Sequence, residues 1–217
     1  MVFVDARTFA ALNLLPPPLV DLFNEITDYG KSGWFLWPSG LLIVALALIA
    51  GPALGRVSNL VIVSLAVRLE FLFIAVAAPG LLITIAKRLI GRVRPSELGP
   101  FAYEPFSWRA DYAGLPSGHS TSAFAAAIAI GVLWPRTRPF VWIYAVIIAL
   151  SRVIIGAHYP SDVIAGAFVG AFGALVVRNI FAARRRGLVV GPDGAVRVLP
   201  GPSMQRLKRV AARVLGH

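Results

Sequence analysis

Residues 151–162 read SRVIIGAHYPSD and separate two strongly apolar segments. An Arg, a His and an Asp therefore stand close together in an apolar setting, where each is costly to bury without a partner, and this grouping indicates chemistry. His158 and Asp162 are four residues apart, so on one helical turn they share a face and can form a hydrogen bond. Arg152 precedes the break between the segments, and Ser161 is a candidate cap for the next helix. An oriented imidazole beside a guanidinium suits an anionic, phosphate-like substrate.

The composition around this stretch is that of a membrane protein. Of 217 residues, 58% are hydrophobic and 14% are charged, with a mean hydropathy of +0.76. A soluble domain has about a quarter charged residues. The net charge of +11 comes from Arg residues that flank apolar spans, as the positive-inside rule predicts, and does not indicate nucleic-acid binding. The chain has no cysteine, so thiolate metal sites are excluded.

The apolar pattern predicts an all-α, polytopic bundle of about five to six transmembrane helices. A short amphipathic helix at residues 19–26 is expected on the membrane surface. Spans are expected at about 34–50, 71–90, 117–134, 141–155 and 161–181. Arg68 and Glu70 interrupt the long apolar run before residue 90, so residues 57–69 are expected to form a separate helix partly in the interface.

The predicted organisation has three parts: an N-terminal segment (1–33), a transmembrane core (34–181) and a basic tail (182–217). In the tail, Pro-Asp-Gly at residues 192–194 predicts a hairpin, and residues 204–215 form a basic amphipathic helix suited to anionic lipid. The basic turns at 135–139 and 184–186 are separated by two spans and share a side, which is expected to be cytoplasmic and to carry the C-terminus. The loop 91–115 and the break at 156–160 then lie together on the outer side of a cell membrane.

Three polar clusters converge on that outer side. The first runs from Lys87 to Arg94 and Pro95, and the second is Pro-Ser-Gly-His at residues 116–119. The second begins a helix, whose free N–H groups and dipole favour an anion. The third is the stretch at 151–162. Singly, each cluster has an ordinary structural interpretation, such as membrane-edge anchoring or turn formation.

Taken together, the pattern Lys-x6-Arg-Pro, Pro-Ser-Gly-His and Ser-Arg-x5-His-x3-Asp resembles the type 2 phosphatidic acid phosphatase superfamily. Order and internal spacing agree across residues 87–95, 116–119 and 151–162. The resemblance extends over about residues 20–181. It implies a membrane phosphatase that hydrolyses a lipid phosphomonoester or diphosphate through a phosphohistidine, releases inorganic phosphate, and needs no metal or other cofactor.

The resemblance also implies roles for individual residues. His158 is the expected nucleophile, Asp162 orients it, and His119 is the general acid that later activates water. The expected phosphate-binding residues are Lys87, Arg94, Ser117, Gly118 and Arg152. Arg88 and Arg92 do not match motif positions and are expected only as headgroup or surface contacts.

A site at the membrane edge favours a lipid whose phosphate lies at the interface. Phosphatidic acid, phosphatidylglycerophosphate, undecaprenyl diphosphate and a lipid A phosphate all fit, and the oligomeric state is left open. An anion transporter is the alternative from another class, but the His-Asp pair, the second His and the absence of repeats argue against it. A haloperoxidase shares the expected pocket chemistry but is a soluble fold.

Overall fold

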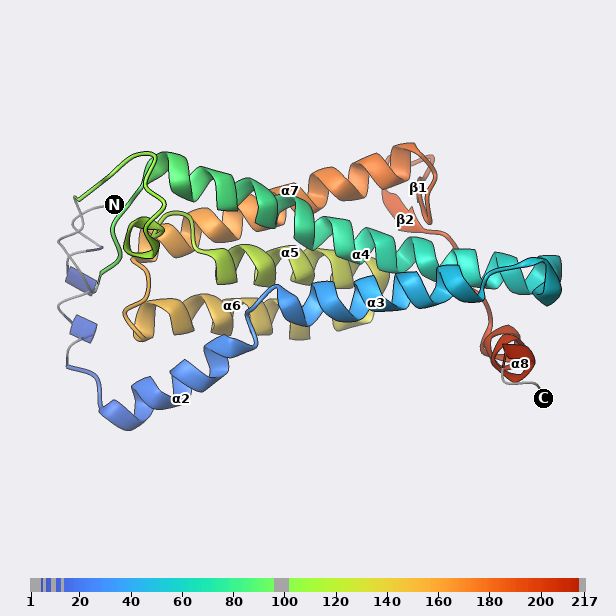
Figure 1. Cartoon of the computed structure of the whole chain (residues 1–217), viewed down its shortest axis with the longest axis horizontal. Helices are drawn as coiled ribbons and strands as arrows, with labels where there is room; N and C mark the ends of the chain where they lie inside the picture. Colours follow the sequence, from blue (N-terminus) through green and yellow to red (C-terminus); the bar gives the residue numbers. More distant parts are fainter. Residues whose placement is uncertain (1–4, 6, 9–10, 13, 96–101, 215–217) are drawn as a thin grey trace.

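The computed structural model describes residues 5, 7–8, 11–12, 14–95 and 102–214, and it is mostly helical. Its long helices run side by side as a bundle, while α2 and α8 lie outside the bundle (Figure 1). In chain order the elements are α2 (Pro17–Asp28), α3 (Gly33–Ile49), α4 (Gly55–Ile90), α5 (Gly118–Leu133), α6 (Arg138–Ile154), α7 (Pro160–Ala183), β1 (Leu188–Val190), β2 (Val196–Val198) and α8 (Met204–Val214).

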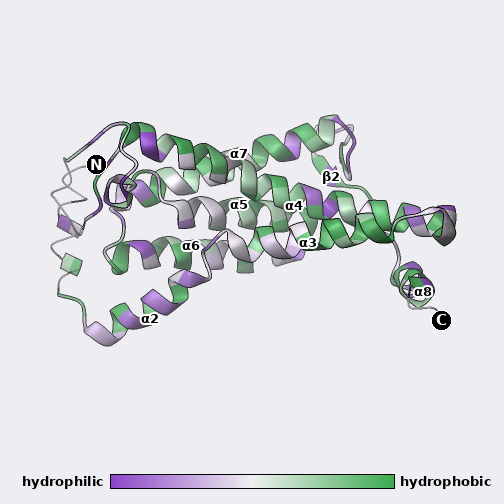
Figure 2. Cartoon of the chain, viewed as in Figure 1, coloured by the Kyte–Doolittle hydropathy of each residue, from purple (hydrophilic) through white to green (hydrophobic). Residues whose placement is uncertain are grey.

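The predicted membrane bundle is confirmed. Four segments are long and apolar enough to cross a membrane, namely 17–49, 55–90, 135–154 and 160–183, and α5 is apolar but shorter, at 16 residues. Hydrophobic residues dominate the middle of the bundle, whereas hydrophilic residues gather towards its ends (Figure 2). Large apolar side chains such as Leu48, Leu81 and Phe168 are exposed on its outside, where lipid tails would solvate them.

One sequence expectation was wrong: residues 55–90 form a single helix of 36 residues, not two. The charges that suggested an interruption have partners in the C-terminal part of the chain. Nη2 of Arg68 donates a 2.7 Å hydrogen bond to the carbonyl of Leu199, and Glu70 forms a 2.7 Å ion pair with Arg186. Since both charges have partners, the helix continues through them.

Helix α5 lies at the centre of the bundle and packs against α4, α6 and α7. Small residues allow this close approach: a Cβ on Gly166 of α7 would lie 2.4 Å from the carbonyl oxygen of Ser117, and one on Gly170 would lie 2.2 Å from that of Thr121. Glycines four residues apart therefore let the α5 and α7 backbones meet, as in many membrane helix pairs. The Thr121 hydroxyl ties the two helices with a 3.1 Å hydrogen bond to the carbonyl of Gly166.

Helix α2 diverges from the bundle below α6 (Figure 1). It begins at Pro17, where the missing N–H costs nothing, and its apolar residues follow one stripe, as the sequence predicts. Its C-terminal end returns to the bundle, where the Tyr144 hydroxyl of α6 donates a 2.8 Å hydrogen bond to the carbonyl of Tyr29. The connection between α2 and α3 is therefore anchored beside α6.

The tail forms the predicted antiparallel hairpin and amphipathic helix. Leu188 is only 1% exposed and belongs to the apolar core formed by α4, α5 and α7. Nη1 of Arg213 donates a 3.2 Å hydrogen bond to Ser58, which brings α8 against the start of α4. Residue 215, the last of the predicted helix, lies outside the described residues.

Candidate active site

The start of α7 places His158 and Asp162 side by side. His158 precedes the helix, and Asp162 lies in its first turn, where Oδ2 accepts a 3.0 Å hydrogen bond from the backbone N–H of Tyr159. The same Oδ2 lies 3.7 Å from Nδ1 of His158, with the two side chains 0% and 2% exposed. The predicted pair is therefore present, although 3.7 Å is longer than a hydrogen bond.

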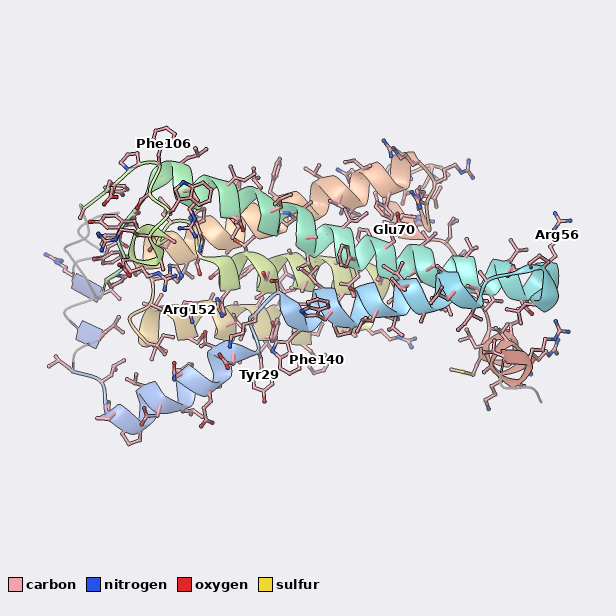
Figure 3. All side chains as sticks on the ribbon, in the orientation of Figure 1. Tyr29, Arg56, Glu70, Phe106, Phe140 and Arg152 are labelled. Carbon is pink, nitrogen blue, oxygen red and sulfur yellow. The ribbon has the colours of Figure 1, made fainter. Side chains whose placement is uncertain are left out.

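The end of α6 holds Arg152 next to this pair. The backbone N–H of His158 donates a 3.1 Å hydrogen bond to the carbonyl of Arg152, across a turn in which Gly156 adopts a φ of +66°. Arg152 is buried, and its Nη1 donates a 2.9 Å hydrogen bond to the hydroxyl of Thr27 on α2. Arg152 lies towards one end of the bundle, whereas Arg56 marks the opposite end (Figure 3).

The start of α5 lies beside the His158–Asp162 pair at the start of α7. Ser117 is fully buried at the N-cap of α5, and its backbone N–H donates a 2.9 Å hydrogen bond to the carbonyl of Asp162. This bond joins the first turns of α5 and α7. Gly118 and His119 follow as the first two residues of α5, so its N-terminal dipole and free N–H groups are directed at this end of the bundle.

Cationic side chains from α4 and the following loop complete the arrangement. A Cβ built on Gly118 would lie 3.6 Å from Nζ of Lys87, which places the last turn of α4 beside the start of α5. Gly91 ends α4 with a φ of +61°, and a Cβ there would lie 1.7 Å from the carbonyl oxygen of Glu104. Only glycine fits this turn, which directs the chain towards Arg94.

A cavity of about 620 Å³ opens between these elements. Its lining includes four of the predicted site residues, Lys87, Arg94, Gly118 and His119. Apolar residues of α3 and α4 line another part of it, Leu36, Val76 and Leu81 among them. Ser117, Arg152, His158 and Asp162 are not in the lining and are buried beside it. The cavity therefore combines a cationic region with an apolar wall.

Several buried nitrogen atoms at this end have no hydrogen-bond partner among the described residues. They are Nε of Arg94, Nε2 of His119, Nε of Arg152 and Nδ1 of His158. A buried donor without a partner is costly, so those of Arg94, His119 and Arg152 are available to a bound group, whereas Nδ1 of His158 faces Asp162. Three such nitrogens near one cavity, on two predicted phosphate ligands and the predicted proton donor, match the demand of a tetrahedral oxyanion.

The electrostatic environment keeps His158 neutral. Burial lowers the pKa of the His158 imidazole to about 4, the charges of Lys87 and Arg152 act in the same direction, and the Asp162 carboxylate opposes them. A neutral imidazole retains the lone pair that a nucleophile requires.

Two expectations at this site were wrong. Ser161 does not cap α7, since Tyr159 occupies the N-cap, and its side chain contacts Asp5 and Arg92 instead. Arg92 is not a surface contact, because it is 3% exposed and bonded to Asp162. Asp5 and Thr27 were not predicted to belong to the site, because neither lies in a recognisable motif.

Comparison with known families decides the class of the protein. The family model of the PAP2 superfamily matches residues 69–186, more than half of the chain. The chain belongs to the PAP2 superfamily. The predicted resemblance is thus confirmed, and this PAP2 protein is a membrane lipid phosphatase by family.

Individual relatives agree with this assignment. A lipid A 1-phosphatase of Rhizobium johnstonii is 37% identical over 203 residues, which cover 90% of this chain and 79% of the relative. The crystal structure of Aquifex aeolicus LpxE matches 82% of this chain and 99% of its own, with a TM-score of 0.59 and 22% identity. The crystal structure of the transmembrane PAP2-type phosphatidylglycerolphosphate phosphatase of Bacillus subtilis matches 82% of this chain and 84% of its own, with a TM-score of 0.55 and 22% identity. These two structures support the fold of this PAP2 protein.

Proposed function

We propose that this PAP2 protein removes a phosphate from a membrane lipid through a phosphohistidine formed on His158. The convergence of unpartnered buried nitrogens from His119, Arg94 and Arg152 beside the His158–Asp162 pair carries the proposal. Because Nδ1 of His158 faces Asp162, Nε2 is the attacking nitrogen. The carboxylate would stabilise the positive charge that develops on the ring when Nε2 bonds to phosphorus.

The remaining residues would bind the charged phosphoryl group or transfer protons. Lys87, Arg94 and Arg152, with the Ser117 hydroxyl and the Gly118 N–H, would bind the non-bridging oxygens of the phosphoryl group. His119 would donate its proton to the oxygen that leaves with the lipid. It would then take a proton from water, which attacks phosphorus and releases inorganic phosphate and His158. All cations in this scheme are side chains, so we expect turnover to persist in EDTA.

The substrate class follows from the cavity and from the relatives. A charged region beside an apolar wall suits a lipid with its phosphate at the interface and its chains in the bilayer. Because the relative from Rhizobium johnstonii carries the name lipid A 1-phosphatase, lipid A is the first substrate to test. Phosphatidic acid, phosphatidylglycerophosphate and undecaprenyl diphosphate are the comparison substrates.

The orientation in the membrane belongs to the same proposal. Glu70 lies away from Arg152, towards the other end of the bundle (Figure 3), and it pairs with Arg186 of the basic residues 184–186 that follow α7. By the positive-inside rule that end faces the cytoplasm, so the site would face the outer side. Cysteine-accessibility labelling in intact cells tests this, using Arg109→Cys in the loop after α4 and Arg197→Cys in the tail, both of which replace exposed side chains.

The function is tested by phosphate release from each lipid by the purified full-length chain in EDTA. His158→Ala should abolish release, and His119→Ala should lower it by about 10²–10⁴-fold, the usual contribution of a general acid. Arg197→Met, which removes an exposed cation of the tail hairpin, is the matched control and should leave turnover unchanged. Unchanged turnover in His158→Ala would refute the proposal, and ³²P trapped on His158 would test the covalent step.

A further inference from the structure

Arg92 joins two buried carboxylates behind the proposed nucleophile. Its Nη1 lies 2.6 Å from Oδ1 of Asp162, and its Nη2 lies 2.9 Å from Oδ2 of Asp5. The two carboxylate side chains are 0% and 2% exposed, and that of Arg92 is 4% exposed. The guanidinium also stacks on the Tyr159 ring, with Cζ 4.6 Å from the ring centroid. This group is thus built from three segments: the N-terminal segment, the loop after α4 and the start of α7.

Asp5 is bound to the start of α7 as well as to Arg92. Its Oδ2 accepts a 2.6 Å hydrogen bond from the Ser161 hydroxyl, and its Oδ1 accepts a 3.1 Å bond from the Ser161 backbone N–H. Burial raises the pKa of the Asp5 carboxyl, but the hydrogen bonds from Ser161 and Arg92 outweigh it, so that the pKa lies below its usual range. Asp5 is therefore a carboxylate at neutral pH.

These contacts determine how Asp162 can lie. Oδ1 is held by Arg92 and Oδ2 by the Tyr159 N–H, so the plane of the carboxylate is fixed from both sides. Oδ2 is the atom that faces Nδ1 of His158. A rotation of the carboxylate would move Oδ2 away from the imidazole, and Arg92 prevents it.

Charge balance explains why two carboxylates are needed. Arg92 alone would neutralise Asp162 and weaken its support of a positive imidazole. With Asp5 as the second partner of Arg92, the buried group retains one net negative charge beside His158. A buried ion pair is an inefficient way to stabilise a fold, since desolvation offsets much of the attraction.

We propose that Arg92 and Asp5 are positioning residues for the reaction: Arg92 fixes the carboxylate of Asp162 against His158, and Asp5 holds Arg92 and compensates its charge. This inference depends on the proposed function, because it assigns the two residues to the step at His158. Neither residue would touch the substrate. Their loss should therefore lower kcat and leave KM nearly unchanged.

The test compares Asp5→Asn, Arg92→Lys and Arg92→Met in the full-length enzyme. A misplacement of about 1 Å at a reacting group can cost roughly a hundredfold, so we expect kcat to fall about tenfold in Asp5→Asn and about a hundredfold in Arg92→Met. Arg92→Lys keeps the charge but reaches one carboxylate, so its kcat should lie between that of Arg92→Met and the wild type. The rate of ³²P incorporation into the enzyme in a single turnover should fall by the same factors.

Arg109 and Asp111 provide the matched control, because they form an Arg–Asp pair that is 65% and 42% exposed. Arg109→Met and Asp111→Asn should keep kcat within about twofold, as expected of a surface pair. Melting temperature in detergent is measured for every variant. If Arg92→Met does not fold, Asp5→Asn and Arg92→Lys decide the question.

The inference is overturned if folded Asp5→Asn and Arg92→Lys keep wild-type kcat, if KM changes in place of kcat, or if kcat falls only in step with thermal stability. Those results leave the proposed function intact, because the wild type and His158→Ala would still differ. A wild-type enzyme that releases no phosphate from any lipid would instead refute the proposed function, and this inference with it.

Discussion

Nη1 of Arg152 lies 2.9 Å from the hydroxyl oxygen of Thr27, and this hydrogen bond links the amphipathic helix α2 to a proposed phosphate ligand. The two residues are 125 positions apart in the chain, and both are buried. Nearby, a Cβ on Gly30 would lie 3.1 Å from Cδ2 of His119. The end of α2 is therefore a wall of the site as well as a surface element.

Thr27→Val should lower kcat/KM about tenfold, because a hydrogen bond to a charged group contributes about 1.5–3 kcal/mol. The substitution keeps the shape of the side chain and removes only the acceptor that orients Arg152. The kcat/KM of Thr27→Val is measured by steady-state phosphate release. Thr137→Val removes a hydroxyl at the start of α6, where it donates to the carbonyl of Trp134, and should leave kcat/KM unchanged. Equal kcat/KM in the two variants would show that the Thr27 hydroxyl does not orient Arg152.

Acid should destabilise the protein partly through His158. Its pKa is about 4 in the folded chain, below the ordinary value of about 6.5, so protons bind preferentially to the unfolded state. The contribution of neutral His158 to stability is complete above about pH 6.5 and is lost as the pH falls towards 4. Melting temperature measured from about pH 7.5 to 4.5 should fall more steeply for wild type than for His158→Gln. Parallel curves would show that His158 does not titrate in this way.

Gly170→Ala should destabilise the bundle, since its Cβ would lie 2.2 Å from the carbonyl oxygen of Thr121. Overpacking of this kind costs about 1–3 kcal/mol, or several degrees of melting temperature in detergent. Gly80→Ala is the matched substitution inside α4, because a Cβ there meets nothing within 4 Å. It should be neutral or slightly stabilising, given the better helix propensity of Ala. A similar drop in melting temperature in both variants would argue against close packing of α5 on α7.

Leu188→Ala should also destabilise the protein, although it lies in the tail. The side chain is 1% exposed within the core, and a buried Leu→Ala change costs about 2–5 kcal/mol. Val190→Ala in the same strand is the control, because Val190 is 51% exposed and its loss should have little effect. Thermal melting of the two variants in one detergent makes the comparison. Equal melting temperatures would mean that the hairpin is not part of the core.

The sequence anticipated the elements that have a local signature. Apolar periodicity predicted the bundle, Pro-Asp-Gly predicted the hairpin, and the motifs at 87–95, 116–119 and 151–162 came together at one end of it. Local pattern could not predict contacts made by isolated residues. Arg68 and Glu70 suggested a break in α4 because their partners, Leu199 and Arg186, lie more than a hundred residues away.

The same limit applies to the site. Asp5 lies in a mixed segment without periodicity, and nothing near it in the sequence indicates that Arg92 and Ser161 are its partners. Arg92 itself falls between two motif positions, so spacing gave it no role. A buried Arg in a loop can be recognised only when the carboxylates around it are known.

The length of α4 has a practical consequence. Its 36 residues, at about 1.5 Å each, make a rod of about 54 Å, whereas the hydrocarbon core of a bilayer is about 30 Å thick. Part of the surplus lies beside α8 (Figure 1) and would extend into the headgroup layer on that side of the membrane. Single-particle imaging of a 23.2 kDa membrane protein lacks features for alignment, and an antibody fragment raised against α8 and the adjoining start of α4 would supply a fiducial at the end remote from the proposed catalytic residues.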